Sequence, residues 1–195
     1  MYKSTSTIKL LTLFAAIFFS NAANASAQGA DKRVEEIRML EIVTNSQIVL
    51  MEGKMELSSI FAIELTVNKY LSPYPAVGIY QSTATFYYTY GDREKNPYPD
   101  RLLKVTVEYR RSSRTEKGEF YFNAAGQLVF ALVTNEEGEV KESRAYFAAG
   151  RMIKLTDDGK EIGLKRPRAV EVAFLAKAEA ARLAGIFRAS LREVN

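Results

Sequence analysis

The sequence predicts a single α+β domain in which an N-terminal helix, an antiparallel sheet of about six strands and a C-terminal covering helix follow one another. Three observations predict this order. Apolar residues recur at helical spacing near the N-terminus, segments of alternating polarity separated by glycine turns fill the middle, and an alanine-rich segment with one apolar face ends the chain. Because the two kinds of pattern occupy separate runs of the sequence, helices and strands are not expected to alternate.

The first 27 residues have the order of a secretory signal peptide. Lys3 and Lys9 precede any acidic residue, an apolar run spans 10–19, and small residues follow it. A spanning helix needs about 20 apolar residues, roughly twice this run, so we expect cleavage rather than anchoring. Cleavage after Ala25 or Ala27 fits, and Ala27 is preferred. The expectation is a signal peptide over 1–27, one domain over 28–195, a periplasmic or secreted location, and no membrane span after cleavage.

The composition restricts the partners and the source of stability. Removing the two lysines of the leader lowers the formal net charge from +4 to +2, which is too small to favour nucleic acid or an anionic membrane. The chain has no cysteine, so disulfides cannot stabilise it and core packing must do so. An exported protein without disulfides is more typical of a bacterial periplasm than of the eukaryotic exterior.

The first element expected in the mature chain is a helix over 31–54. Asp31 is a suitable N-terminal cap, and Gly53 is a suitable end signal. Val43, Val49 and Leu50 lie off the main apolar stripe. The helix is therefore either covered on more than one side or shorter than the range 31–54.

The middle of the chain predicts a β-meander. Residues 60–67 are rich in strand formers, although helix and strand remain open there, and 84–90 is rich in aromatic residues and threonine. Residues 103–110 alternate apolar and polar side chains, which indicates a half-buried antiparallel strand. Further strands are expected at 119–123, 128–134, 139–147 and 152–156.

The breaks between these strands each end in glycine, at Gly126, Gly138 and Gly150, which favours short hairpin loops and adjacent antiparallel strands. The sequence of 120–129 is echoed at 145–153, about 25 residues later. Two copies are too few for a solenoid, so a repeated hairpin within one sheet is the interpretation.

The last element expected is a helix over 168–194, with Pro167 at its start. Its apolar face, which includes Leu183, Ile186 and Phe187, should cover the sheet. Glu179 interrupts this face and Phe174 lies opposite it.

The chemistry available is limited, because the chain contains neither histidine nor cysteine. This excludes a Ser-His-Asp triad, a thiol nucleophile and zinc–histidine sites, and no glycine-rich phosphate loop is present. Carboxylate chemistry remains, as does a lysine or serine acting with unusual partners, and the enzymatic alternative is a pair of carboxylates acting on an envelope glycan. The acidic turn at 157–161 has oxygen ligands for calcium but lacks the spacing of an EF-hand, so a turn is the preferred interpretation. We expect no catalytic residue, metal or cofactor.

The aromatic residues of the predicted sheet suggest a binding surface. Neighbouring side chains of a strand point to opposite faces, so Tyr87 and Tyr121 lie on the face away from Phe86 and Phe120. Exposed tyrosines bind proteins and sugars well. Tyr74 and Tyr98 stand in two Pro-Tyr-Pro segments, which stiffen loops. The candidate binding surface is therefore Tyr74, Tyr87, Tyr98 and Tyr121. The alternatives are that helices cover both faces, or that tyrosine pairs only stabilise the sheet.

The hairpins at 120–128 and 146–153, with the pattern Tyr-Phe-x-x-x-Gly-x-Leu, resemble segments of uncharacterised secreted proteins of Gram-negative bacteria. The resemblance covers residues 80–160. It implies an exported β-meander protein and assigns no activity and no functional residue.

The function expected from these observations is that of an exported, non-enzymatic binding or accessory protein with a protein or glycan partner in the envelope, acting through the aromatic face. One alternative is the carboxylate-dependent hydrolase. The other is a carrier of a small apolar ligand, which requires a cavity between the sheet and the C-terminal helix, lined by Leu183, Ile186 and Phe187.

Overall fold

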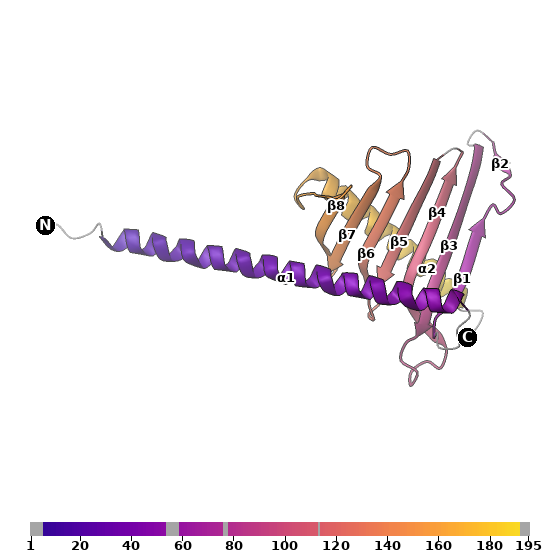
Figure 1. Ribbon diagram of the computed structural model, residues 1–195, viewed down its shortest axis with the longest axis horizontal. Helices are drawn as coiled ribbons and strands as arrows, with labels where there is room; N and C mark the ends of the chain where they lie inside the picture. Colours follow the sequence, from indigo (N-terminus) through magenta and orange to yellow (C-terminus); the bar gives the residue numbers. More distant parts are fainter. Residues whose placement is uncertain (1–5, 54–58, 76–77, 113, 192–195) are drawn as a thin grey trace.

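The part of the chain that the structure describes consists of a long helix, a nine-stranded antiparallel sheet and a second helix, which confirms the α+β class (Figure 1). The computed structural model describes residues 6–53, 59–75, 78–112 and 114–191, with side chains from Gly29 onward. The elements are α1 (Ser6–Glu52), β1 (Phe61–Val67), β2 (Pro73–Tyr74), β3 (Gly78–Tyr90), β4 (Pro99–Arg111), β5 (Arg114–Phe122), β6 (Leu128–Asn135), β7 (Glu142–Ala148), β8 (Arg151–Asp157), β9 (Lys160–Glu161) and α2 (Pro167–Ser190).

The sheet is a meander in which, from β3 to β9, each strand pairs with the next along the chain. Its order is β1-β3-β4-β5-β6-β7-β8-β9, and the short β2 pairs with the start of β3. The order follows from short connections, which force neighbouring strands to be antiparallel. The sheet has more strands than the expected number of about six, because β1 falls where helix and strand remained open, and β2 and β9 have two residues each and carry no periodic pattern.

Two of the hairpins show why their turn residues are needed. The loop between β7 and β8 is Ala149-Gly150, and the loop between β8 and β9 is Asp158-Gly159. All four residues have positive φ, as a two-residue type I′ turn requires. The expected strand at 139–147 is shorter than predicted, because the chain stays in a turn until Lys141, whose carbonyl accepts from the Asn135 amide.

One face of the sheet is covered by α2. Side chains of alternate strand positions, such as Phe86 and Val105, are at most 1% exposed and pack on this face. The helix lies close to the sheet because many of its inward positions are alanine. Leu183 and Phe187 of α2 are 0% and 2% exposed, so both pack in the core, and Ile186 is half-buried against it. Pro167 stands at the start of the helix, as predicted.

The other face is covered by α1. Residues spaced three and four apart along this helix, among them Val34, Ile37, Thr44 and Ile48, are buried against the sheet. Figure 1 shows α1 crossing the strands opposite α2, with its N-terminal part extending past β8. Helices thus cover both faces, which was one of the open alternatives.

Two details of the predicted N-terminal helix are corrected. Helix α1 passes through Asp31 without interruption, so Asp31 is not an N-terminal cap. The helix ends at Glu52, directly before Gly53 and two residues earlier than expected. Among the residues that the structure describes, no helix is long and apolar enough to cross a membrane.

Candidate ligand-binding pocket

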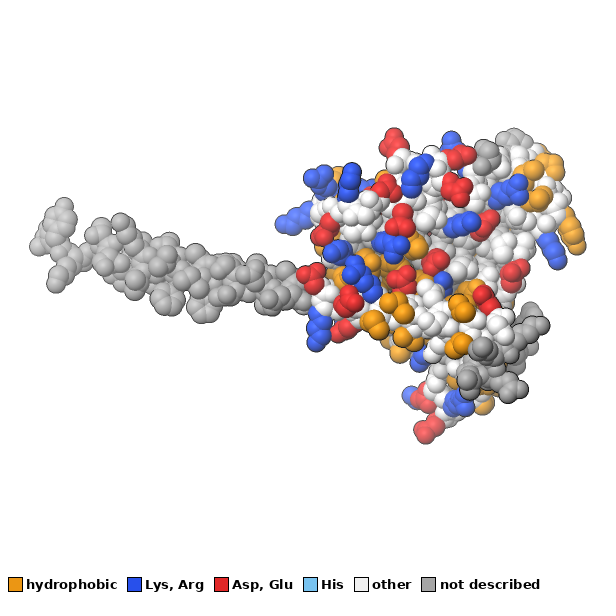
Figure 2. Space-filling view, viewed as in Figure 1, with side chains coloured by type: hydrophobic (Ala, Val, Ile, Leu, Met, Phe, Trp, Pro, Cys, Tyr) orange, Lys and Arg blue, Asp and Glu red, His pale blue; other side chains and the backbone are white. Residues whose placement is uncertain are grey.

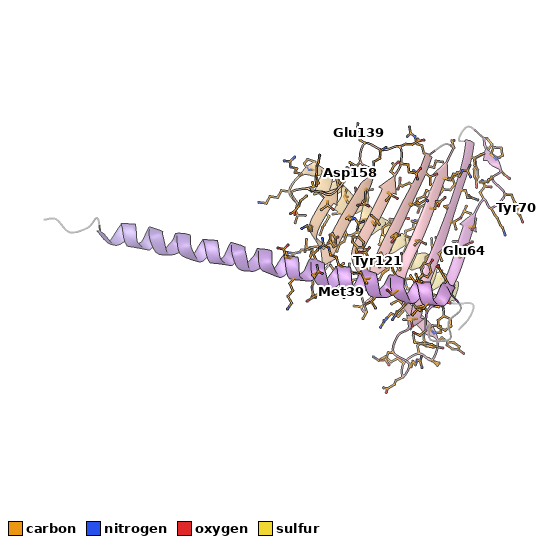
Figure 3. All side chains as sticks on the ribbon, viewed as in Figure 1. Met39, Glu64, Tyr70, Tyr121, Glu139 and Asp158 are labelled. Atoms are coloured by element: carbon orange, nitrogen blue, oxygen red, sulfur yellow. The ribbon has the colours of Figure 1, made fainter. Side chains whose placement is uncertain are left out.

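The four tyrosines predicted to form a binding surface do not lie together. Tyr121 is fully buried under α1, and Tyr87 is half-buried against the same helix (Figure 3). The expectation that Tyr121 is exposed is therefore wrong, because α1 covers the face to which its side chain points. Tyr74 and Tyr98 are 45% and 47% exposed. They lie beside opposite ends of β3, about 40 Å apart at the rise of an extended strand.

A cavity of about 260 Å³ lies instead between α2 and the sheet. Its apolar wall comes from alternate positions of β4, β5 and β6. Leu175 of α2 lines it and is 54% exposed, so the cavity opens to solvent beside this residue. The lining residues are Val107, Tyr109, Glu116, Gly118, Phe120, Val133, Asn135, Val140, Ser143, Arg168, Val172, Leu175, Ala176 and Glu179.

Gly118 determines how the wall of the pocket packs. A Cβ atom at this position would lie 2.8 Å from Phe120 Cε2 and 3.1 Å from Val107 Cγ1. The first distance is shorter than real Cβ contacts allow. The ring of Phe120 can therefore lie over β5 at this point only because residue 118 has no side chain. A glycine inside a strand often marks such a close approach.

A network of Tyr109, Glu179 and Arg182 closes one end of the pocket. Arg182 donates from Nε to Glu179 Oε2 at 2.8 Å and from Nη2 to Glu179 Oε1 at 2.7 Å. It also donates to the Tyr109 hydroxyl at 2.5 Å, and that hydroxyl donates to Glu179. Burial and then the Glu179 carboxylate raise the pKa of Tyr109. Burial alone would raise the pKa of Glu179, but hydrogen bonds from Arg182 and Tyr109 outweigh it and hold this pKa below its ordinary value.

We expect Glu179→Gln to destabilise the fold at neutral pH but not in acid. Because the folded pKa of Glu179 is lowered from 4.5, the ionised carboxylate stabilises the fold above that pH, and this stabilisation is lost as the pH falls through the folded pKa. At neutral pH the free energy of unfolding of the variant should be about 1 kcal/mol lower than that of the wild type. Urea unfolding of both proteins from about pH 7 to about pH 3 measures the difference between their free energies of unfolding. A difference that stayed constant over this range would contradict a lowered pKa of Glu179.

A second network anchors the start of α2 at the other end of the pocket. Ser143 donates to Asp157 Oδ1 at 2.7 Å, and Arg168 donates to Asp157 Oδ2 at 3.1 Å and to Ser143 Oγ at 3.2 Å. Ser143 and Asp157 are 7% and 8% exposed. Asp158, which was considered as a calcium ligand, accepts from the amides of Lys141 and Glu142. The acidic turn thus uses its oxygens within the protein.

Among the described residues, Glu116 is the pocket carboxylate with no partner inside the protein. It lies opposite Tyr109 and Asn135 in the ladders of β5, and its side chain lines the cavity. In the described part of the chain, no hydrogen bond or ion pair engages its carboxylate. The carboxylates of Glu179 and Asp157 are both occupied by arginine, so Glu116 carries the uncompensated negative charge of the pocket.

The pocket holds two acids, as a glycosidase would require, but Glu179 does not fit the role of general acid. Such an acid needs a raised pKa, and the pKa of Glu179 is lowered. A further group of polar side chains, which includes Lys104 and Glu119, lies between α1 and the sheet. In the ranges that the structure covers, no group of three or more acidic, histidine or cysteine side chains is placed to hold a metal ion.

Sequence reasoning did not identify the pocket residues. Glu179 was visible as an acid interrupting the apolar face of the C-terminal helix, and Tyr109 as the last apolar position of an alternating strand. A charged residue on a core-facing stripe needs a partner when buried, and this signal pointed to the site.

Comparisons of the chain with protein-family models, curated proteins and solved structures found no match.

Proposed function

We propose that this is an exported, non-enzymatic binding protein that holds a small, largely apolar ligand bearing a cationic group in the pocket between α2 and the sheet. The observation that carries the proposal is the pocket itself, an apolar cavity with a few convergent polar groups. Such a cavity is the usual form of a small-molecule site. The order of charged, apolar and small residues at the N-terminus supports export.

The size of the pocket limits the ligand. At about 30 Å³ per water-sized unit, 260 Å³ holds about nine non-hydrogen atoms. Val107, Phe120 and Val133 offer contact to an aromatic ring or a short aliphatic chain. The arginines of the site already bind Glu179 and Asp157, so they favour no additional anion. The carboxylate of Glu116 favours an ammonium group on the ligand.

The proposal is tested with 2-phenylethylamine and 2-phenylethanol, which have similar shape and differ in charge. We expect both to shift amide resonances of residues that line the pocket, such as Gly118 and Val133. The amine should bind about tenfold more tightly, because a charge-assisted hydrogen bond contributes about 1.5 kcal/mol or more. Glu116→Gln should remove this preference and leave binding of the alcohol unchanged. NMR titration measures both affinities.

Matched variants on α2 show whether binding occurs in this pocket. Ala176 is buried and lines the cavity, whereas Ala178 is exposed two residues later on the same helix. Ala176→Leu should fill the space and weaken binding of both compounds by at least about tenfold, and Ala178→Leu should bind as the wild type does. The proposal is rejected if neither compound shifts pocket resonances, or if a folded Ala176→Leu protein binds them with unchanged affinity.

A further inference from the structure

Helix α1 carries a second apolar stripe on the side away from the sheet. Five large apolar side chains on it are 38–66% exposed: Met39, Ile42, Val43, Val49 and Leu50. At 3.6 residues per turn, these positions lie opposite Val34, Ile37 and Ile48, which pack on the sheet. Figure 2 shows apolar side chains gathered along α1 on the solvent side, and Figure 3 labels Met39 among them. We define these five residues as the outer stripe.

The charge pattern of α1 supports a covered outer stripe. No charged residue occurs from Ile42 to Met51, whereas 31–41 carries charges of both signs. A helix that covers a sheet and faces water normally has charged residues on its outer side. A helix that is apolar on both sides is typical of a buried element. The half of α1 from Ile42 onward therefore resembles a helix between two partners, of which the sheet is one.

The outer stripe is large enough for a symmetric dimer. Its five side chains expose several hundred Å², the upper range for a monomer surface. A twofold pair counts this area twice and buries about 1,000 Å², which reaches the lower limit for a specific interface. Because the outer stripe has no charge, two copies that meet across a twofold axis place no like charges against each other there.

The charges at the start of α1 select the direction of the pair. In a parallel pair, Glu35 and Glu36 would face the same residues of the other copy, which is unfavourable. In an antiparallel pair centred on Ser46, Ile42 and Val43 face Leu50 and Val49, and the charged ends lie apart. Ser46 is small and its hydroxyl donates to the Ile42 carbonyl at 2.9 Å, so it brings no unpaired polar group into the contact. A small residue at the crossing lets two helices approach closely.

We propose that two copies of this chain associate through the outer stripe, with their α1 helices antiparallel and Ser46 at the twofold axis. Sedimentation of the protein, expressed as the full chain and purified in the form that export leaves, should show a reversible monomer–dimer equilibrium between about 1 and 100 µM. Val49→Glu should shift it to monomer, with the dissociation constant raised at least about tenfold. Gln47→Glu adds the same charge on the same turn outside the stripe and should dimerise like the wild type. A protein that stays monomeric at about 100 µM, or a Val49→Glu variant that dimerises normally, overturns the proposal.

Single cysteines test the direction, because the chain has none of its own. Under mild oxidation Ser46→Cys should form a disulfide-linked dimer. Met39→Cys should not, since the two positions would be about 21 Å apart along an antiparallel pair. Cross-linking of both variants would indicate a parallel pair, and cross-linking of neither would indicate that α1 does not form the contact. Either result overturns the arrangement.

Discussion

Tyr121→Ala is expected to lower the free energy of unfolding by about 3–5 kcal/mol, as deletion of a large buried ring does. The Tyr121 ring is fully buried, lies 5.6 Å from the ring of Phe130 between centroids, and packs under α1. Its hydroxyl donates to Glu119 at 2.8 Å and also lies 3.0 Å from Asn45 Oδ1, so the substitution removes polar contacts to α1 and the sheet as well. Equilibrium unfolding in urea or guanidinium measures the loss.

Tyr98→Ala is the matched control, because this ring is 47% exposed in a loop. Its effect should stay within about 0.5 kcal/mol. If Tyr121→Ala were equally harmless, α1 would not cover the second face, and the aromatic surface considered from the sequence would be restored as a binding site. The pair of variants thus decides between a covered and an open face.

Lys104→Met is expected to lower the free energy of unfolding by about 2–4 kcal/mol, because it leaves the Glu119 carboxylate beneath α1 without its cation. Lys104 Nζ lies 2.9 Å from Glu119 Oε2 and donates to Asn45 Oδ1 at 2.9 Å. The lysine side chain is 9% exposed and that of Glu119 is 34% exposed. The loss should therefore fall toward the lower end of the range for a fully buried pair. Guanidinium unfolding of Lys104→Met and wild type measures it.

The double variant Lys104→Met with Glu119→Gln identifies the cause. The double variant should lose at least about 1 kcal/mol less unfolding free energy than the two single variants lose in sum, since no uncompensated charge remains. Strictly additive losses would mean that the two side chains act independently, which would contradict the interaction seen in the structure. Glu41 lies near this pair, and burial raises the pKa of its carboxyl.

Local patterns were sufficient to predict most of the sheet. The alternation along 103–110 placed Val105 and Val107 on a buried face, and β4 confirms it with both residues at most 3% exposed. The opposed directions of Phe120 and Tyr121 were also predicted correctly. The repeated hairpin has a structural counterpart, since Tyr121 and Tyr146 both face α1 while Phe122 and Phe147 both face α2. Side-chain direction within a strand depends only on neighbouring positions.

Local patterns could not predict that α1 packs on the second face of the sheet, nor that a pocket lies between α2 and the first face. Val43, Val49 and Leu50 made α1 apolar around most of its circumference, so the sequence did not show which side meets the sheet. The pocket combines Glu116 of β5 with Glu179 of α2, which are far apart in the sequence. Their proximity depends on where α2 crosses the sheet, and this is decided by packing of the whole core.

Helix α1 precedes the strands in the sequence and α2 follows them, and this order affects how the molecule is completed. Strands that neighbour in space also neighbour in sequence, so the hairpins have low contact order and form locally. The face with Phe86, Val105 and Leu155, however, is closed only by the last helix, Pro167–Ser190. A chain still emerging from a ribosome therefore has an apolar sheet face open until α2 has been released. Such an intermediate exposes apolar surface that a holding chaperone can bind, and the core on this face is completed only when α2 packs on the sheet.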